Sequence, residues 1–369
     1  MTATRRQKWI SLLLAAIPAV VAVLLYLLLP LFPGFTETVM TGGVFRVLSV
    51  PYGWLMQWLP VSVTELLVVL GIPAAVVLLV IGIVRVVRAP QKKAALYRLL
   101  RPIAWVLSVL LLLYMLLHGV NYYRRTAADL MGLELRTHTT AELATLSNYF
   151  AGQAATVRAE LTEAPDGTVQ LEGSLSHLLA EAGEGYAALD DTYPFLWGAT
   201  NRVKPVLLSH AWSYTGITGM YFPMLAEANV NIDQPLWCVP FTAAHELAHT
   251  RGFAREDECN FLAFLSCSRH PSVDYRYSGY YMAYIYCINA LNRLDPEQAQ
   301  AIAASVDEGF RRDLTAQSEY WDAFEGPVQE VSDSINSGFI SSQGVPDGSY
   351  SYGRCVDLML SWAETEGIL

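Results

Sequence analysis

Long apolar runs dominate the first third of the chain, and shorter amphipathic stretches follow them. Three of the runs are each close to the roughly 20 residues that a helix needs to cross a lipid bilayer. They cover about residues 9–31, 64–87 and 102–120. The pattern therefore predicts an N-terminal region of three transmembrane helices, residues 1–125.

The first apolar run begins after Arg5, Arg6 and Lys8, as the apolar part of a signal peptide does. It is longer than the apolar part of a usual signal peptide, and no small-residue cleavage site follows it. We therefore expect a retained anchor. The connection over residues 32–63 is itself apolar and aromatic, so it is expected either to lie on the outer membrane surface or to cap a soluble domain.

After residue 125 the hydrophobic period becomes that of amphipathic helices with a few short strands. Helices are expected at about residues 140–161, 174–189, 242–251, 256–268, 279–294, 296–323, 328–336 and 354–366. Strand-like patterns cover about residues 203–206, 217–224 and 226–233. Residues 126–369 are therefore predicted to form a mostly helical α+β domain with one small sheet.

The charges predict the orientation of the helices in the membrane. The connection over residues 85–101 carries six Lys and Arg residues, whereas the connection over residues 32–63 carries only Arg46. Because basic residues concentrate on the cytoplasmic side, the N-terminus and the basic connection are expected to be cytoplasmic. Three crossings then place residues 126–369 outside the cytoplasm. The protein is thus expected to be a multi-pass protein of the cell membrane, with the lipid bilayer as a partner.

The overall charge balance excludes a nucleic-acid partner. Residues 1–125 hold 12 Lys and Arg against two Asp and Glu, whereas residues 126–369 hold 12 against 32. The predicted soluble half is therefore strongly acidic, which a nucleic-acid-binding surface is not. All five cysteines lie in this half, and because no pair has C-x-x-C spacing, neither a structural zinc knuckle nor a redox pair is indicated. Small buried residues or one or two disulfides remain as interpretations.

The clearest chemical motif is His-Glu-Leu-Ala-His at residues 245–249. On a helix, positions i and i+4 share one face, so His245 and His249 can direct their imidazoles at one metal ion. Glu246 follows the first of these histidines, where it reaches a water molecule on the metal instead of the metal itself. An ordinary polar helix face is the competing interpretation.

A catalytic zinc site needs a third protein ligand and one open position. Gly252 is suited to end the helix in a left-handed turn, and an acidic stretch, Glu256-Asp257-Glu258-Cys259-Asn260, begins the next helix. Glu256 and Glu258 are the nearest candidates for the third ligand. They point in different directions on a helix, so only one is expected to bind, and Glu256 is favoured.

The motif and the acidic stretch resemble the zincins, a group of zinc metallopeptidases, and their gluzincin branch in particular. The resemblance implies Zn²⁺ as cofactor, Glu246 as general base, Glu256 as third ligand and Asn260 as a partner of a zinc-binding histidine. The spacing between His249 and Glu256 is shorter than in most gluzincins. The residues up to Gly252 also resemble the metzincins, but Arg255 stands where those proteins have a third histidine.

The whole chain also resembles a family of bacterial multi-pass membrane proteins of unknown function. The matching segments are Lys204-Pro205, Gly216–Gly219, Glu227–Asn231, His245–Asn260, Arg276–Tyr280 and Ser351–Gly353. This resemblance implies no substrate.

Hydrolysis also needs an electrophile beside the metal to polarise the scissile carbonyl. Candidates downstream of the motif are His270, Arg276, Tyr277 and Tyr280, of which Tyr280 is favoured because it follows Gly279 at a predicted helix start. Packing in a dense aromatic run is the alternative role for any of these tyrosines.

The strand just before the motif helix is the expected substrate-binding edge, since zincins pair an extended peptide with such a strand. Asn229 and Asn231 share one of its faces and are predicted to bind the peptide backbone, and Glu227 is expected to line the pocket. A plain core strand is the alternative. His118, in the third apolar run, is expected to lie at the membrane interface.

These observations together predict a membrane-anchored, zinc-dependent peptidase that hydrolyses peptide bonds in a peptide or protein substrate. A membrane sensor or scaffold with a structural or vestigial metal site is the alternative. Glu246 argues against it, because a purely structural site has no use for a base beside the first ligand.

Overall fold

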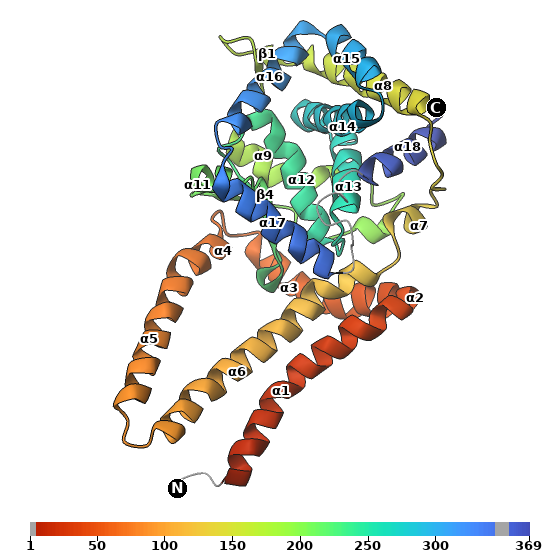
Figure 1. The fold of residues 1–369 in the computed structure, drawn as a ribbon. Helices are drawn as coiled ribbons and strands as arrows, with labels where there is room; N and C mark the ends of the chain where they lie inside the picture. Colours follow the sequence, from red (N-terminus) through yellow and green to blue (C-terminus); the bar gives the residue numbers. More distant parts are fainter. Residues whose placement is uncertain (1–4, 344–353) are drawn as a thin grey trace.

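The computed structural model describes residues 5–343 and 354–369. Long helices project from a larger helical body (Figure 1). We call residues 5–125 the N-terminal region and residues 126–369 the C-terminal half. The projecting helices are α1 (Arg5–Leu28), α5 (Ile72–Arg88) and α6 (Lys92–Leu117). Helix α1 packs along α6, whereas α5 diverges from α6 after a short turn (Figure 1).

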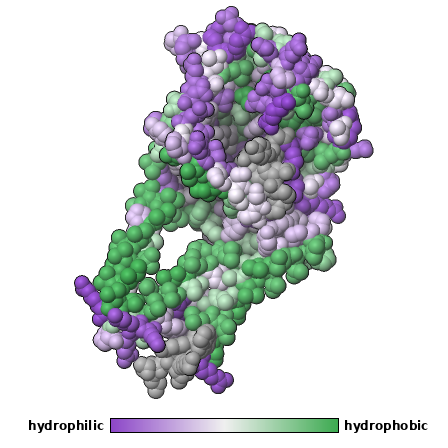
Figure 2. All heavy atoms as spheres, in the orientation of Figure 1, coloured by the Kyte–Doolittle hydropathy of each residue, from purple (hydrophilic) through white to green (hydrophobic). Residues whose placement is uncertain are grey.

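Three helices in the described part of the chain are long and apolar enough to cross a membrane. They comprise Ile10–Leu31, Val63–Arg88 and Lys92–Leu117. Almost all of their large apolar side chains are exposed, and Figure 2 shows these arms covered by hydrophobic residues while the body is mostly hydrophilic. This distribution is compatible with a membrane protein, since lipid is the solvent in which such surfaces are stable.

The third of these helices begins ten residues earlier than predicted, at Lys92 instead of residue 102. It continues through Pro102, so the turn between α5 and α6 contains only residues 89–91. The Lys and Arg residues of the predicted connection, residues 85–101, therefore lie in the last turn of α5 and the first turns of α6. Long basic side chains at such positions can extend towards water. The helix ends at Leu117, three residues before the predicted end.

The first connection packs against the C-terminal half. Phe45 and Thr41 lie against Gly252, and the Lys204 ammonium donates to the carbonyl oxygens of Met56 and Leu59. The connection therefore caps the C-terminal half, one of the two expected arrangements. The shorter elements of the N-terminal region are η1 (Leu29–Leu31), α2 (Pro33–Phe35), η2 (Thr36–Phe45), α3 (Arg46–Met56), α4 (Val63–Leu66), η3 (Leu67–Gly71) and η4 (Gly119–Tyr123).

The C-terminal half is mostly helical, as predicted. Its α-helices are α7 (Ala127–Met131), α8 (Thr140–Arg158), α9 (Leu175–Glu181), α10 (Glu184–Ala187), α11 (Ser209–Ser213), α12 (Val239–Thr250), α13 (Glu256–Ser268), α14 (Val273–Leu294), α15 (Pro296–Ser305), α16 (Glu308–Asp322), α17 (Pro327–Ser342) and α18 (Cys355–Thr365). Short 3₁₀ helices are η5 (Pro194–Leu196), η6 (Pro223–Leu225) and η7 (Leu236–Cys238).

Two small sheets accompany these helices, where one was expected. The three predicted strands, β3 (Lys204–Val206), β4 (Gly219–Phe222) and β5 (Glu227–Asn231), form one sheet in the order β3-β5-β4. β5 is parallel to β3 and antiparallel to β4. The second sheet is a hairpin of β1 (Thr162–Glu163) and β2 (Val169–Gln170) around a turn at residues 164–167.

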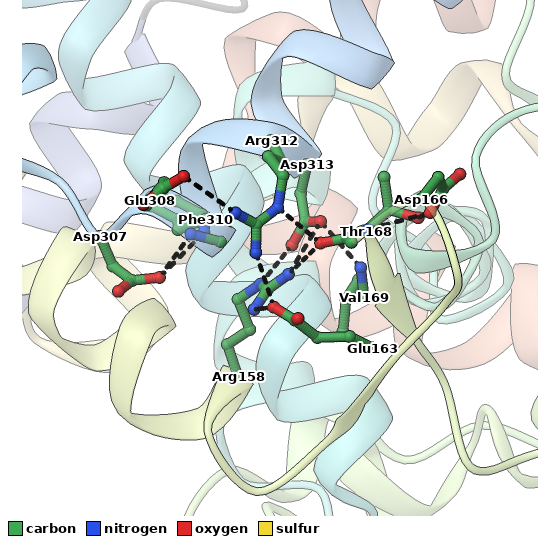
Figure 3. Close-up of polar contacts among 12 residues, drawn as sticks. Arg158, Glu163, Asp166, Thr168, Val169, Asp307, Glu308, Phe310, Arg312 and Asp313 are labelled. Atoms are coloured by element: carbon green, nitrogen blue, oxygen red, sulfur yellow. Dashed lines mark hydrogen bonds and ion pairs between the residues drawn. The ribbon is translucent and has the colours of Figure 1, made fainter.

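The core of the C-terminal half lies where α14 packs against α8, α12 and α13. All five cysteines are in the described part of the chain, and each is buried and unpaired, as the interpretation of small core residues requires. A buried ion pair joins α8 to α16, because Arg158 Nε lies 2.7 Å from Asp313 Oδ2 (Figure 3). Asp313 also accepts a hydrogen bond of 2.8 Å from the Val169 amide, so the same carboxylate binds β2.

Candidate metal centre

Helix α12 carries the motif and holds it at the centre of the C-terminal half. It starts at Val239 with Pro240 in its first turn, where the missing amide of proline costs nothing. Most of the helix is buried. His245 and His249 lie one turn apart, and their ring centroids are 5.0 Å from each other. The periodicity of the helix thus places both imidazoles side by side.

The chain turns sharply after this helix and returns an acidic side chain to the same point. Gly252 has a φ of 85°, in the left-handed region that favours glycine, and α13 begins four residues later at Glu256. Glu256 Oε2 lies 3.0 Å from His245 Nε2, and Oε1 lies 3.8 Å from His249 Nε2. The three residues offer donor atoms that are all within 4.8 Å of one another, which is compatible with one metal ion.

The other ring nitrogens of the two histidines are engaged, which fixes their orientation. His249 Nδ1–H donates to the carbonyl oxygen of Phe253 at 2.9 Å. His245 Nδ1 lies 2.8 Å from Asn260 Oδ1, and the Tyr286 hydroxyl donates to the same oxygen. With Nδ1 engaged in each ring, the Nε2 atoms face Glu256, the orientation that metal-binding histidines have.

The charges within the cluster favour a bound cation. Burial opposes the ionised form of Glu256, but the imidazoles of His249 and His245 outweigh it and lower the pKa of the carboxyl to about 2. Burial also opposes protonation of His245, yet Glu256 raises its pKa to about 9. Burial lowers the pKa of His249. A proton therefore occupies the space between His245 and Glu256 when no metal does, and a metal ion competes with it.

Glu246 lies beside this cluster and faces the sheet. It is buried, and its Oε2 atom has no hydrogen-bond partner among the described residues. Burial raises the pKa of this carboxyl to about 8, and a hydrogen bond from the Tyr221 backbone acts against the rise. A Cβ atom at Gly219 would lie 2.5 Å from Glu246 Oε1, so only glycine at this position of β4 leaves room for the carboxylate.

The structure separates the two candidates for the third ligand. Glu258 is on the same helix as Glu256 but is directed away from the cluster, and its Oε1 accepts a hydrogen bond of 2.9 Å from the Ala127 amide. This hydrogen bond therefore connects α13 to the start of α7, the first helix of the C-terminal half. Burial raises its pKa to about 7.

Asn229 and Asn231 are not available to a substrate, contrary to the prediction. Asn229 is buried, accepts a hydrogen bond from the Ser62 hydroxyl and donates to the Met220 carbonyl, while Asn231 donates to Ser213 and to the Ile217 carbonyl. Their strand, β5, is the middle strand of the sheet and has a paired neighbour on each side. The strand at the edge next to the motif helix is β4, which contacts α12 as well.

Glu227 does not line a pocket either. Its carboxylate accepts hydrogen bonds from the amides of Val63 and Thr64, at 3.1 and 2.8 Å, and from the Ser62 hydroxyl. It therefore caps the start of α4, the first turn of the second long apolar helix. The alternative of a core strand describes β5 better than a substrate-binding strand does.

None of the four predicted electrophiles lies beside the cluster. The Tyr280 ring packs against Phe150 and Phe264 in the core, so the favoured candidate has a packing role instead. Tyr277 donates to the Asp313 carboxylate. Arg276 donates to backbone carbonyls of the loop before α14. His270 hydrogen-bonds to the Glu181 carbonyl. Helix α14 starts at Val273, six residues earlier than expected, and this removes Gly279-Tyr280 from a helix start.

A cavity of about 870 Å³ opens above the cluster and contains groups that the sequence did not reveal. His245, Glu246, His249 and Glu256 form its floor, and the edge strand β4 forms one side. His118 and Tyr221 also line it, and their rings lie 5.9 Å from the His249 ring. His118 is buried, and Nδ1 has no hydrogen-bond partner among the described residues. This residue is thus part of the cavity wall and not only a residue at the end of an apolar helix.

The fold and the cluster define a helical protein with three membrane-length helices and a His/His/Glu site. The chain belongs to the family described as "Protein of unknown function (DUF3810)", which matches residues 41–360. The match begins within the first connection and extends into α18, so the family comprises both parts of the molecule. Comparisons with curated proteins and with solved structures found no match.

Proposed function

We propose that this protein is a membrane-anchored, zinc-dependent peptidase of the zincin type. The observation that carries the proposal is the arrangement of four side chains. His245, His249 and Glu256 offer three converging donor atoms. The Glu246 carboxylate lines the same cavity, and its Oε2 atom has no hydrogen-bond partner among the described residues. Two imidazoles and one carboxylate are the donor set of catalytic zinc sites that leave a fourth position open.

The residues fit a zinc ion for a second reason. Both imidazoles present Nε2 to the site because Asn260 and Phe253 bind Nδ1. The proposed metal-binding residues are therefore His245, His249 and Glu256, and Asn260 orients the first of them. A bound Zn²⁺ would supply Lewis acidity to a peptide carbonyl and to a water molecule.

The protein's own groups then account for the proton transfers. Glu246 accepts a proton from the attacking water and passes it to the leaving amine, a role for which its carboxylate is placed because it lines the same cavity as the three proposed ligands. β4 is an edge strand of the sheet, so an extended peptide can pair with it. His118 and Tyr221 replace Tyr280 as candidates for the electrophile, because they line the cavity next to His249.

The same proposal includes the membrane orientation. The basic residues at the turn between α5 and α6 would lie in the cytoplasm and the C-terminal half outside it. A sensor or scaffold with a structural metal site is the weaker alternative. A structural site is closed by its ligands, whereas this one faces a cavity of about 870 Å³.

The test uses the full chain in detergent, because residues of the N-terminal region line the cavity. The wild-type protein is expected to cleave quenched fluorescent peptides from a mixed-sequence library. Glu246→Gln should abolish cleavage while retaining bound zinc, because Glu246 is not a ligand. Zinc loss in Glu246→Gln would show that the roles are wrongly assigned. Cleavage that persists at the wild-type rate in this variant would refute the peptidase mechanism.

A further inference from the structure

Helix α17 forms one wall of the cavity and turns an apolar face towards it. Val328, Val331, Ile335 and Phe339 line the cavity, and their spacing places them on one side of the helix. These side chains are 57%, 59%, 69% and 41% exposed. An apolar helix face that lines a cavity but is not covered by other described residues is typical of a site for an apolar ligand.

An adjoining wall comes from the N-terminal region, at the end of α6. Tyr114 and His118 line the cavity, and the Tyr114 ring lies 6.2 Å from the Phe339 ring. The Tyr26 hydroxyl of α1 donates to the Ser342 carbonyl at the end of α17. The cavity is therefore located where α1 and α6, two of the membrane-length helices, meet the body.

The arms leave space beside these helices. Figure 2 shows an opening between the arm formed by α5 and the arm formed by α1 and α6, directly below the body. The residues that face it are mainly hydrophobic (Figure 2). A further apolar segment therefore has room between the arms on the same side of the body as the N-terminal wall of the cavity.

The charges of the cavity limit the chemistry of its ligand. Among the described residues that line it, the charged side chains are Glu246, Glu256 and Asp333, and there is no Lys or Arg. Phosphate groups and free carboxyl termini are usually held by Arg or Lys side chains. The lining therefore disfavours an anionic lipid head group and a peptide cleaved next to its own C-terminus.

We propose that the substrate is a membrane-anchored polypeptide whose apolar segment adjoins the cleaved bond. This inference rests on the proposed peptidase function and specifies its substrate class. The apolar segment packs on the Val331 and Ile335 face of α17 at the end of α6, and the extended stretch that follows it pairs with β4 above the metal-binding cluster.

The test compares two peptides with the full chain reconstituted in vesicles of neutral phospholipid. Both peptides share one quenched fluorescent cleavage sequence, and one of them continues into a Leu-rich anchor of about 20 residues. Ile335→Asp is expected to lower the ratio of anchored-peptide cleavage to free-peptide cleavage about 10-fold or more, because only the anchor packs on this face. Val331→Asp should act in the same way.

Ser334→Asp is the matched control, because Ser334 is exposed on α17 but does not line the cavity. It should leave cleavage of both peptides unchanged. Equal effects of Ile335→Asp and Ser334→Asp on the anchored peptide would overturn the inference while the peptidase proposal stands. Absence of cleavage of both peptides by the wild-type protein would instead overturn the peptidase proposal.

A binding measurement decides the inference independently of activity. The anchored peptide, with a photoreactive group in its apolar segment, is cross-linked to the full-length Glu246→Gln variant, and the labelled residues are identified by mass spectrometry. Labels on α17 that an excess of unlabelled anchored peptide removes would support the inference. Labels confined to other elements, or equal protection of α17 by an anionic phospholipid, would overturn it.

Discussion

Asn260 orients His245 from the side opposite the cluster of His245, His249 and Glu256. Its Oδ1 atom accepts from His245 Nδ1 at 2.8 Å and so keeps Nε2 directed at Glu256. Asn260→Ala should weaken zinc binding about 10–100-fold, which is typical of the loss of a partner behind a ligand. Glu256→Ala should weaken it more, because it removes a charged ligand.

Glu258→Ala is the matched control from the same helix and should leave the zinc affinity of the full chain nearly unchanged. Zinc titrations measure all three, and a larger effect of Glu258→Ala would exchange the roles of the two acids.

Gly219 provides the space that the Glu246 carboxylate occupies. A Cβ atom there would lie 2.5 Å from Oε1 and 2.8 Å from Cγ of Glu246. Gly219→Ala should therefore displace the base and lower kcat by about 10²-fold while zinc content stays near the wild-type value. Gly152→Ala is the control, since no atom lies within 4 Å of its added Cβ and alanine favours the helix. Unchanged peptide cleavage in Gly219→Ala would show that Glu246 does not act as the base from this position.

The sequence reveals the local part of this site and not the distant part. His245, Glu246 and His249 lie within about one helical turn, and Glu256 follows His249 by only seven residues, after the left-handed turn at Gly252. Local backbone geometry therefore relates all four side chains. His118 and Tyr221 reach the same point from other elements. Nothing in the periodicity around either residue indicates that contact, because it depends on how the N-terminal region, for His118, and β4, for Tyr221, pack against the motif helix.

At the scale of elements, a strand of the C-terminal half caps a helix of the N-terminal region. Glu227 of β5 is buried and accepts hydrogen bonds from two amides at the start of α4. Glu227→Ala should lower the free energy of unfolding by about 1–3 kcal/mol, because it leaves these amides without a partner. Glu319→Ala, an exposed change on α16, should alter stability by less than about 0.5 kcal/mol. Chemical unfolding in detergent compares the two variants, and equal stability would remove the capping role of Glu227.

Two predicted helices are each divided in the structure where a single residue interrupts a continuous pattern. The expected helix over residues 174–189 breaks at Gly183, whose amide donates to the Asn201 carbonyl and whose Cβ position is filled by Asn201. The expected helix over residues 296–323 breaks at Asp307, which caps α16 by accepting from the amides of Gly309 and Phe310. The three strands of the larger sheet were predicted at the right places, but their order depends on long-range pairing that the sequence does not show. For this reason β5, the middle strand, was predicted as the substrate-binding edge instead of β4.

At the scale of the whole molecule, polar contacts join the two parts. Arg124 forms an ion pair of 2.7 Å with Glu37 and donates to the Gly252 carbonyl at the end of the motif helix. Glu65 at the start of the second long apolar helix accepts from the amides of Leu207 and Leu208. The number of long apolar helices follows from hydropathy alone, whereas these contacts join residues more than 80 positions apart and leave no periodic signal in the sequence.

The orientation of the molecule can be measured because every native cysteine is buried. In intact cells, a membrane-impermeant thiol reagent should label Ala304→Cys, an exposed position on α15, and should fail to label Gln91→Cys at the turn between α5 and α6. The six basic residues around that turn are the reason for this expectation. After the cells are opened, both positions should react. The reverse pattern in intact cells would place the C-terminal half in the cytoplasm.

Zinc content and coordination of the purified full chain test the central claim most directly. The account predicts close to one zinc per chain, with X-ray absorption showing nitrogen and oxygen ligands at about 2.0–2.2 Å and no sulfur at about 2.3 Å. The absence of sulfur matters because Cys259 Sγ lies 3.4 Å from His249 Nδ1, on the side of the ring away from the cluster. His249→Ala should lose the metal. A wild-type protein that holds no stoichiometric transition metal, or one whose zinc has a sulfur ligand, would contradict the account.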